Sequence, residues 1–155
     1  MVYLTRRYRF SAAHRLHTEA LGPEENARVY GKCNNPLGHG HNYVLEVTVA
    51  GPVDPATGMV YDLTMLDSVV QGEVLDRFDE THLNLDTENF RNLVPTAENI
   101  AIEIFNLLEP RLEAAGRWAA ARLDRVRLEE TNSNFFDYAG EGDRDFVERR
   151  VRWRQ

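Results

Sequence analysis

Histidines stand at three positions where they could hold a metal ion together. His39 and His41 are two residues apart at the mouth of the most regularly alternating segment of the chain, residues 41–50, which His41 begins. Alternate residues of a strand share a face, so both imidazoles can converge on one point. His14 ends an earlier strand-like segment, and pairing of the two strands would bring it beside them. Three imidazoles without a fourth protein ligand are typical of catalytic Zn²⁺. A His-x-His pair alone is more often polar residues at a strand edge, so the prediction depends on that pairing.

The lone cysteine lies just before the histidine pair. Cys33 belongs to a turn-rich loop, residues 31–36, and follows Lys32 directly. A positive neighbour and a nearby metal would favour its thiolate, which could then serve as a base or nucleophile. The alternative is a small buried apolar side chain. One cysteine excludes an internal disulfide and favours a reducing compartment.

Carboxylates supply the remaining candidate groups. Asp79 and His82 follow a predicted helix at a spacing that would let the carboxylate orient the imidazole for proton transfer. Their alternative is a solvated helix end. Glu130 takes an apolar-facing position in a predicted strand, where a carboxylate needs a partner. That partner is either a flat heterocycle with two parallel N–H donors, such as a pterin, or one of the chain's arginines.

Hydrophobic periodicity predicts the elements that position these groups. A period of two indicates strands, and a spacing of three and four indicates helices. The turn cluster at residues 54–58 predicts a hairpin back through residues 59–61. The result is an α+β fold, an antiparallel β-sheet with two helices on one face. The predicted strands are residues 2–12, 41–50, 123–131, 135–138 and a last stretch at 147–153, and the predicted helices are residues 63–78 and 97–116.

Size and charge narrow the class of protein. The 155 residues fit a single domain, residues 1–155, and their net charge is 18 − 25 = −7. A nucleic-acid-binding domain usually presents a basic face, so nucleic acid is not an expected partner. No apolar run approaches the roughly 18 residues that cross a bilayer. The first residues lack the apolar stretch of a signal peptide, so we expect a cytoplasmic protein without a membrane partner.

Several motifs resemble one known family. Phe10-Ser-Ala-Ala-His14-Arg-Leu-His17 is followed by Tyr30-Gly-Lys-Cys33-Asn-Asn-Pro-Leu-Gly-His39-Gly-His41-Asn-Tyr43. Together they resemble the 6-pyruvoyl tetrahydropterin synthase and 6-carboxytetrahydropterin synthase family. The likeness covers about residues 3–140 and leaves residues 142–155 unmatched. It continues through residues 54–58, 83–86, 95–99 and 130–132.

The resemblance implies a fold and a set of roles. Sheets of several subunits would close into a barrel (the tunnelling fold), usually as a homohexamer of two trimers. Cys33 matches the catalytic cysteine and Glu130 the carboxylate that anchors the pterin ring, while Thr96 and Glu98 match the neighbouring pocket segment. The family's Zn²⁺ ligands match His14, His39 and His41.

The resemblance also implies an activity, with alternatives. The expected enzyme is a zinc-dependent lyase that converts 7,8-dihydroneopterin triphosphate to 6-pyruvoyl tetrahydropterin with loss of triphosphate. One alternative is 6-carboxytetrahydropterin synthase, which releases acetaldehyde and triphosphate on the path to 7-deazaguanine nucleosides such as queuosine. Another is a zinc-holding, pterin-binding protein with little turnover.

One motif departs from the family pattern. The family has Asp-His-x-x-Leu-Asn, whereas this chain reads Asp79-Glu80-Thr81-His82-Leu83-Asn84. Glu80 therefore stands where the family has its acid–base histidine. Either His82 takes that role from a shifted position, or Glu80 transfers the proton, or the step is impaired. We favour His82 working with Asp79.

Overall fold

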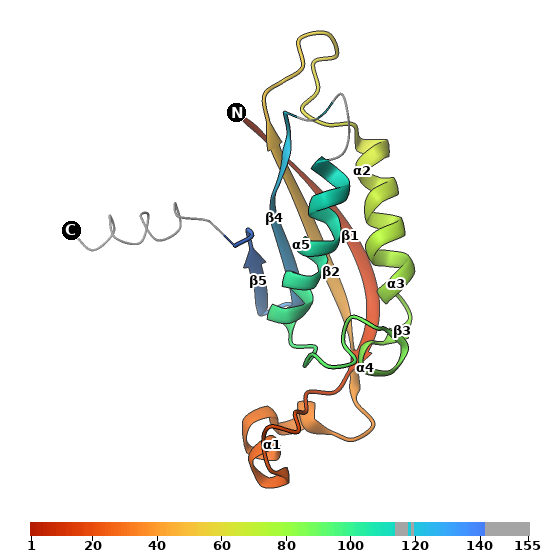
Figure 1. Cartoon of the computed structure of the whole chain (residues 1–155), viewed down its shortest axis with the longest axis vertical. Coiled ribbons are helices and arrows are strands. Elements are labelled where there is room, and N and C mark those ends of the chain that lie inside the picture. The colour runs from red at the N-terminus through yellow and green to blue at the C-terminus, as the bar shows by residue number, and fades with distance from the viewer. Residues whose placement is uncertain (114–117, 119, 142–155) are drawn as a thin grey trace, which may run out of the picture.

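The computed structural model describes residues 1–113, 118 and 120–141. A five-stranded sheet in the order β3-β1-β2-β4-β5 carries helices on one face (Figure 1). The predicted α+β class is therefore confirmed. The strands are β1 (Val2–His14), β2 (His39–Gly51), β3 (Thr81–His82), β4 (Arg122–Thr131) and β5 (Asn134–Tyr138). The helices are α1 (Pro23–Tyr30), α2 (Leu63–Val70), α3 (Asp76–Phe78), α4 (Leu83–Asp86) and α5 (Ala97–Glu113), with a 3-10 turn η1 (Gly31–Asn34) and a π-helical turn η2 (Gln71–Leu75).

Strand directions correct the prediction of a purely antiparallel sheet. β1–β2, β2–β4 and β4–β5 are antiparallel, but β3 pairs parallel to β1 through Ala12–Thr81 and Ala13–His82. The reason lies in the path of the chain. β2 returns to the end of the sheet where β1 began, and the following helices run back down one face (Figure 1). β3 therefore continues in the direction of β1.

The hairpin predicted through residues 59–61 does not form. Residues 52–62 make turns, in which the Asp54 backbone N–H donates to the Met59 carbonyl at 2.9 Å. Asp62 then caps α2, because its Oδ1 accepts from the Thr64 backbone N–H at 2.8 Å. The cap starts a helical run through α2, η2 and α3 that ends at Phe78, as the spacing predicted for residues 63–78.

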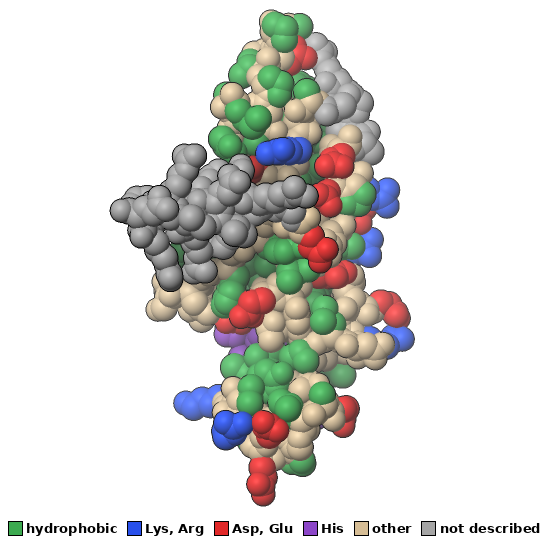
Figure 2. Space-filling model, turned by 60° about the vertical axis from the view of Figure 1, so that its left-hand side comes forward, with side chains coloured by type: hydrophobic (Ala, Val, Ile, Leu, Met, Phe, Trp, Pro, Cys, Tyr) green, Lys and Arg blue, Asp and Glu red, His purple; other side chains and the backbone are tan. Residues whose placement is uncertain are grey.

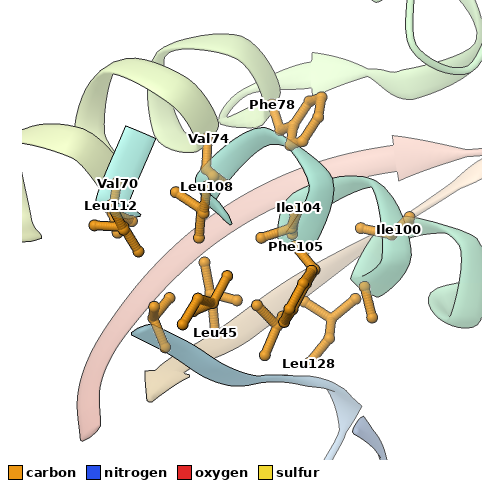
Figure 3. Packing of buried hydrophobic residues seen from close by; sticks show 14 of the residues in the cluster. Leu45, Val70, Val74, Phe78, Ile100, Ile104, Phe105, Leu108, Leu112 and Leu128 are labelled. Carbon is orange, nitrogen blue, oxygen red and sulfur yellow. The ribbon is translucent and has the colours of Figure 1, made fainter. Parts of the chain in front are cut away.

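The core lies between the sheet and these helices. Leu45 and Leu128 project from neighbouring strands toward α5, and Val74 approaches them from the other helical run (Figure 3). The four-residue spacing of Leu66, Val70, Val74 and Phe78 places all of them on this buried face. A packed core of this kind holds β1 and β2 in a fixed register.

Two predictions concern residues outside the described part. These are the strand expected at residues 147–153 and the helix end expected at Gly116. Among the residues that the structure describes, no helix combines the length and the apolarity needed to cross a bilayer.

Candidate metal centre and its surroundings

Strand pairing brings the three candidate histidines together. His14 is the direct cross-strand partner of His39, and His41 lies opposite Ala12 on the same face. The Nε2 atoms of His14 and His39 are 3.2 Å apart. One nitrogen from each of the three rings lies within 4.8 Å of the others. The condition on which the sequence prediction depended is met, and the three imidazoles are placed to hold one metal ion.

A backbone carbonyl fixes the protonation pattern of His14. This ring is fully buried, and its Nδ1 lies 2.7 Å from the carbonyl oxygen of Pro95. A carbonyl only accepts, so Nδ1 of the neutral ring carries the proton and donates it. The lone pair of Nε2 then faces the other two histidines, which is the orientation of a metal ligand. Because Pro95 directly precedes α5, this contact ties the site to the start of that helix.

Burial favours the neutral form of two of these rings, His14 and His39. It lowers the pKa of His14, and the neighbouring His39 and His41 lower it further. Burial also lowers the pKa of His39, with His41 again adding to the effect. Neutral imidazole is the form that binds metal. A set of three nitrogens fits Zn²⁺ in a site that keeps one position open.

The Glu130 carboxylate lies against this cluster. Its Oε1 is 3.8 Å from Nε2 of His14 and 3.8 Å from Nε2 of His41. Its Oε2 accepts a hydrogen bond from Asn134 Nδ2 at 3.2 Å. The β4–β5 register shifts between Glu129 and Thr131, so Glu130 sits at an irregularity that can re-aim a side chain. The sequence left open an arginine partner for Glu130. In the structure it is the adjacent Glu129 that pairs with an arginine, Arg7, at 2.9 Å.

Cys33, in the loop between β1 and β2, is close enough to the same carboxylate to feel its charge. It lies in η1, where its backbone carbonyl accepts from the Leu16 N–H at 2.8 Å. Burial raises the pKa of the thiol, and the charge of Glu130 raises it further. These effects favour the thiol, whereas the neighbouring Lys32 was expected to favour the thiolate. The metal-site histidines, Glu130 and Cys33 thus form one neighbourhood.

Asp79 and His82 do not form the helical-turn pair that their spacing suggested. α3 ends at Phe78, and Glu80 has a positive φ of 58°. Asp79 Oδ1 accepts instead from the Ser11 backbone N–H at 2.8 Å. His82 Nδ1 is buried, and it has no hydrogen-bond partner among the residues that the structure describes. The helix ends too early for the expected geometry, and the carboxylate fastens this segment to β1.

A hollow nevertheless connects this segment to the metal site. It has a volume of about 420 Å³. His41 from the cluster lines it together with both Glu80 and His82. The other lining residues are Ser11, Ala12, Ala13, Gly40, Asn42 and Thr81. Both candidates for the missing acid–base group therefore border a space that reaches a candidate metal ligand.

Within the described part of the chain, Thr96 and Glu98, the residues of the expected pocket segment at the start of α5, make no hydrogen bond or ion pair with the three histidines. The Thr96 hydroxyl accepts from the Asn99 backbone N–H at 3.3 Å, which caps α5. Glu98 is exposed in the first turn of the helix. Thr96 follows Pro95, the partner of His14, so this segment adjoins the cluster through the backbone.

Histidine side chains reach the surface between two hydrophobic areas (Figure 2).

Sequence reasoning missed two parts of the site. The Pro95 carbonyl is a backbone group, and no residue pattern signals what such a group accepts. Asn134 had a weak signal, because it follows a tight turn directly after the unusual Glu130. Recognising it required the irregular β4–β5 register, which depends on strand pairing.

Comparison with known proteins agrees with this arrangement. The family model of 6-pyruvoyl tetrahydropterin synthase matches residues 3–141. A 6-pyruvoyl tetrahydrobiopterin synthase of Poecilia reticulata is 44% identical over 139 residues, which cover 90% of each chain. The solved 6-pyruvoyl tetrahydropterin synthase of Caenorhabditis elegans has a TM-score of 0.81 at 45% identity, covering 90% of this chain and 96% of that one. A 6-carboxy-5,6,7,8-tetrahydropterin synthase of Rickettsia bellii is 29% identical over 153 residues, covering 88% of this chain and 99% of the relative.

Proposed function

Since the chain belongs to the 6-pyruvoyl tetrahydropterin synthase family, we propose that it is a zinc-dependent lyase acting on 7,8-dihydroneopterin triphosphate. The product is 6-pyruvoyl tetrahydropterin, and triphosphate leaves by elimination. The observation that carries the proposal is the cluster of His14, His39 and His41 with the Glu130 carboxylate beside it. This pairs a site for a Lewis acid with an anchor for a heterocycle.

The three histidines hold the metal, and His14 is the most rigid of them because of its bond to Pro95. Bound Zn²⁺ supplies Lewis acidity, which makes the hydroxyl protons of the substrate side chain, and the adjacent C–H, more acidic. Glu130 accepts two N–H bonds from the edge of the pterin ring and so sets its orientation. Thr96 and Glu98 belong to the neighbouring part of the pocket.

Cys33 moves a proton at the substrate's carbon skeleton. Burial raises the pKa of this thiol and the charge of Glu130 raises it further, so both favour the protonated form. The rearrangement is an internal redox reaction and needs no external hydride carrier.

His82 is the second acid–base group, and Glu80 is the alternative. Both line the hollow that reaches His41. Asp79 positions this segment through its bond to Ser11. Replacing Glu80 with His and, separately, His82 with Ala decides between them. A large gain of rate in E80H identifies a native site with an impaired step, whereas loss of rate in H82A without a gain in E80H supports His82.

The proposal includes the assembly and the setting. The sheet ends in the edge strands β3 and β5, and closing several sheets into a barrel would pair such edges. We therefore extend the proposal to a homohexamer of two trimers in the cytoplasm. The partner of the site is a small pterin substrate, without a nucleic-acid or membrane partner.

Two other activities remain as alternatives. The 6-carboxytetrahydropterin synthase reaction would release acetaldehyde on the way to 7-deazaguanine nucleosides, but the identity to the Rickettsia enzyme of that name is lower than the identity to 6-pyruvoyl enzymes. A pterin-binding zinc protein with little turnover would follow from Glu80 in place of the acid–base histidine.

Mass spectrometry of the products separates these activities. Zinc-loaded protein is incubated with 7,8-dihydroneopterin triphosphate. A 6-pyruvoyl product supports the proposal, and carboxytetrahydropterin with acetaldehyde supports the first alternative. Unchanged substrate, from protein that still binds zinc and pterin, would overturn the assignment as an enzyme.

A further inference from the structure

We propose that Asn84 is a positioning residue that holds the two acid–base groups, His82 and Cys33, in one frame. It lies in α4, and its side chain is bonded to the backbone of Arg15, the residue that follows the metal-ligand candidate His14. The inference deepens the proposed function and rests on it for the roles of His82 and Cys33.

The first argument is that the Asn84 side chain continues a strand pairing after the backbone has left it. β3 pairs in parallel with β1, and its last pair is Ala13 with His82. α4 begins at the next residue, so the backbone turns away from the ladder. At the same offset of 69 residues, the Arg15 backbone N–H donates to Asn84 Oδ1 at 2.8 Å, and Asn84 Nδ2 donates to the Arg15 carbonyl at 3.0 Å. The side-chain amide thus takes the place of a peptide group, because it carries the same acceptor and donor.

The second argument is that the stretch held by Asn84 also holds the cysteine loop. The Leu16 backbone N–H donates to the Cys33 carbonyl at 2.8 Å. Asn34, the next residue of η1, donates from Nδ2 to the Leu16 carbonyl at 2.7 Å. The Asn34 carbonyl accepts in turn from Arg15 Nε at 3.2 Å. These hydrogen bonds fasten η1 to the residues that Asn84 places.

His17 joins the same network. Its Nδ1 lies 3.0 Å from Asn34 Nδ2 and 3.3 Å from Arg15 Nη2. Both of these nitrogens only donate, so Nδ1 accepts and the neutral ring carries its proton on Nε2. Nε2 lies 3.4 Å from the Glu19 carboxylate, which can accept that proton's hydrogen bond. The hydrogen bonds therefore run without a break from α4 to η1.

Loss of the Asn84 amide would affect both acid–base groups at once. α4 could then separate from the end of β1, and the distance between His82 and Cys33 would no longer be fixed. Misplacement of a reacting group by about 1 Å can cost about 100-fold in rate. His14 keeps its place, because strand pairing and a backbone carbonyl hold it independently. We therefore expect slower proton transfer at a site that still binds its metal.

Two substitutions test this clamp against a matched control. N84A removes both hydrogen bonds. N84D keeps the size of the side chain and its acceptor but cannot donate to the Arg15 carbonyl. The control is N89A, because Asn89 is also partly buried but its Nδ2 donates to α5, at Glu103 Oε1, over 2.6 Å.

Turnover of 7,8-dihydroneopterin triphosphate by the zinc-loaded protein gives the first readout. We expect kcat per bound zinc to fall roughly 10- to 100-fold in N84A and in N84D. KM and the zinc affinity should stay within about 3-fold of the wild-type values, because the lost interaction positions the reacting groups and does not bind substrate or metal. N89A should match the wild type in all three quantities.

Alkylation of Cys33 by iodoacetamide gives a second readout, which needs no turnover. Cys33 is the only cysteine in the sequence, so labelling of the zinc-loaded protein without substrate reports on the cysteine loop alone. Release of this loop should raise the alkylation rate roughly 10-fold in N84A and N84D. N89A should react at the wild-type rate.

A wild-type kcat in either Asn84 variant would overturn the inference, and so would wild-type alkylation rates in both. Equal effects of N84A and N89A would also overturn it, because Asn84 would then contribute only to general stability. The proposed lyase function fails separately, if the wild type itself leaves dihydroneopterin triphosphate unchanged. The alkylation rates would then still decide whether Asn84 holds the cysteine loop.

Discussion

Gly38, directly before the ligand candidate His39, should not tolerate even one added methyl group. Its φ is +73°, in the left-handed region that side chains disfavour. A Cβ at this position would lie 2.7 Å from the backbone oxygen of His14 and 2.8 Å from Nε2 of His82. Gly58 provides a matched control, because its φ is also +73° but nothing lies within 4 Å of its added Cβ.

The comparison separates backbone strain from steric overlap. An alanine forced into the left-handed region costs about 1–2 kcal/mol, and both variants lose this amount of stability. Only G38A also overpacks, at about 1–3 kcal/mol, because the His14 carbonyl is part of a paired strand and cannot swing aside. We therefore expect losses of about 2–5 kcal/mol for G38A and about 1–2 kcal/mol for G58A.

Urea unfolding of the two metal-free variants measures these losses. Zinc titration adds a functional readout, because relief of the overlap moves His39 away from His14. G38A should bind zinc roughly 10- to 100-fold more weakly, while G58A keeps the wild-type affinity. Equal stability losses in the two variants, or wild-type zinc affinity in G38A, would refute the tight packing of the 38–39 segment against β1 and β3.

Three further predictions concern other parts of the structure. N26A should speed amide exchange in residues 18–34 about 30-fold, because the buried Asn26 side chain bonds the Thr18 backbone N–H and the Leu21 carbonyl, and the two bonds together contribute about 2 kcal/mol. The control N35A changes an exposed residue and should leave the exchange rates unchanged. Equal effects of the two variants would contradict this prediction. Y8F removes the 2.9 Å hydrogen bond from the Tyr8 hydroxyl to the Asp67 carboxylate and should lower the free energy of unfolding, measured in urea, by about 1 kcal/mol. An unchanged free energy of unfolding would show that this bond does not contribute to stability. Metal-free protein should lose stability as the pH falls from about 7.5 to about 5.5, because burial lowers the pKa of His14 and the unfolded chain then binds more protons than the folded one. Urea unfolding at several pH values should show that the free energy of unfolding of H14Q depends less on pH. An equal pH dependence in H14Q and the wild type would contradict the prediction.

The sequence determined the local parts of the site. The two-residue period of a strand is a local property, so His39 and His41 had to share a face once residues 39–51 were extended. The apolar alternation of β4 likewise ended on Glu130, a carboxylate that needed a partner. The spacing of residues 63–78 specified a helix for the same reason, since side-chain periodicity needs no knowledge of the rest of the fold.

Contacts between distant segments were decided only by the tertiary structure. His14 reaches His39 because the packed core fixes the β1–β2 register. The Pro95 carbonyl meets His14 across 81 residues of sequence, and a backbone acceptor leaves no trace in residue type. Asp79 and His82 separate because the helix ends at Phe78 and the chain pairs with β1 instead. Sequence patterns report the direction in which side chains point along one element, whereas these distances depend on how the elements pack.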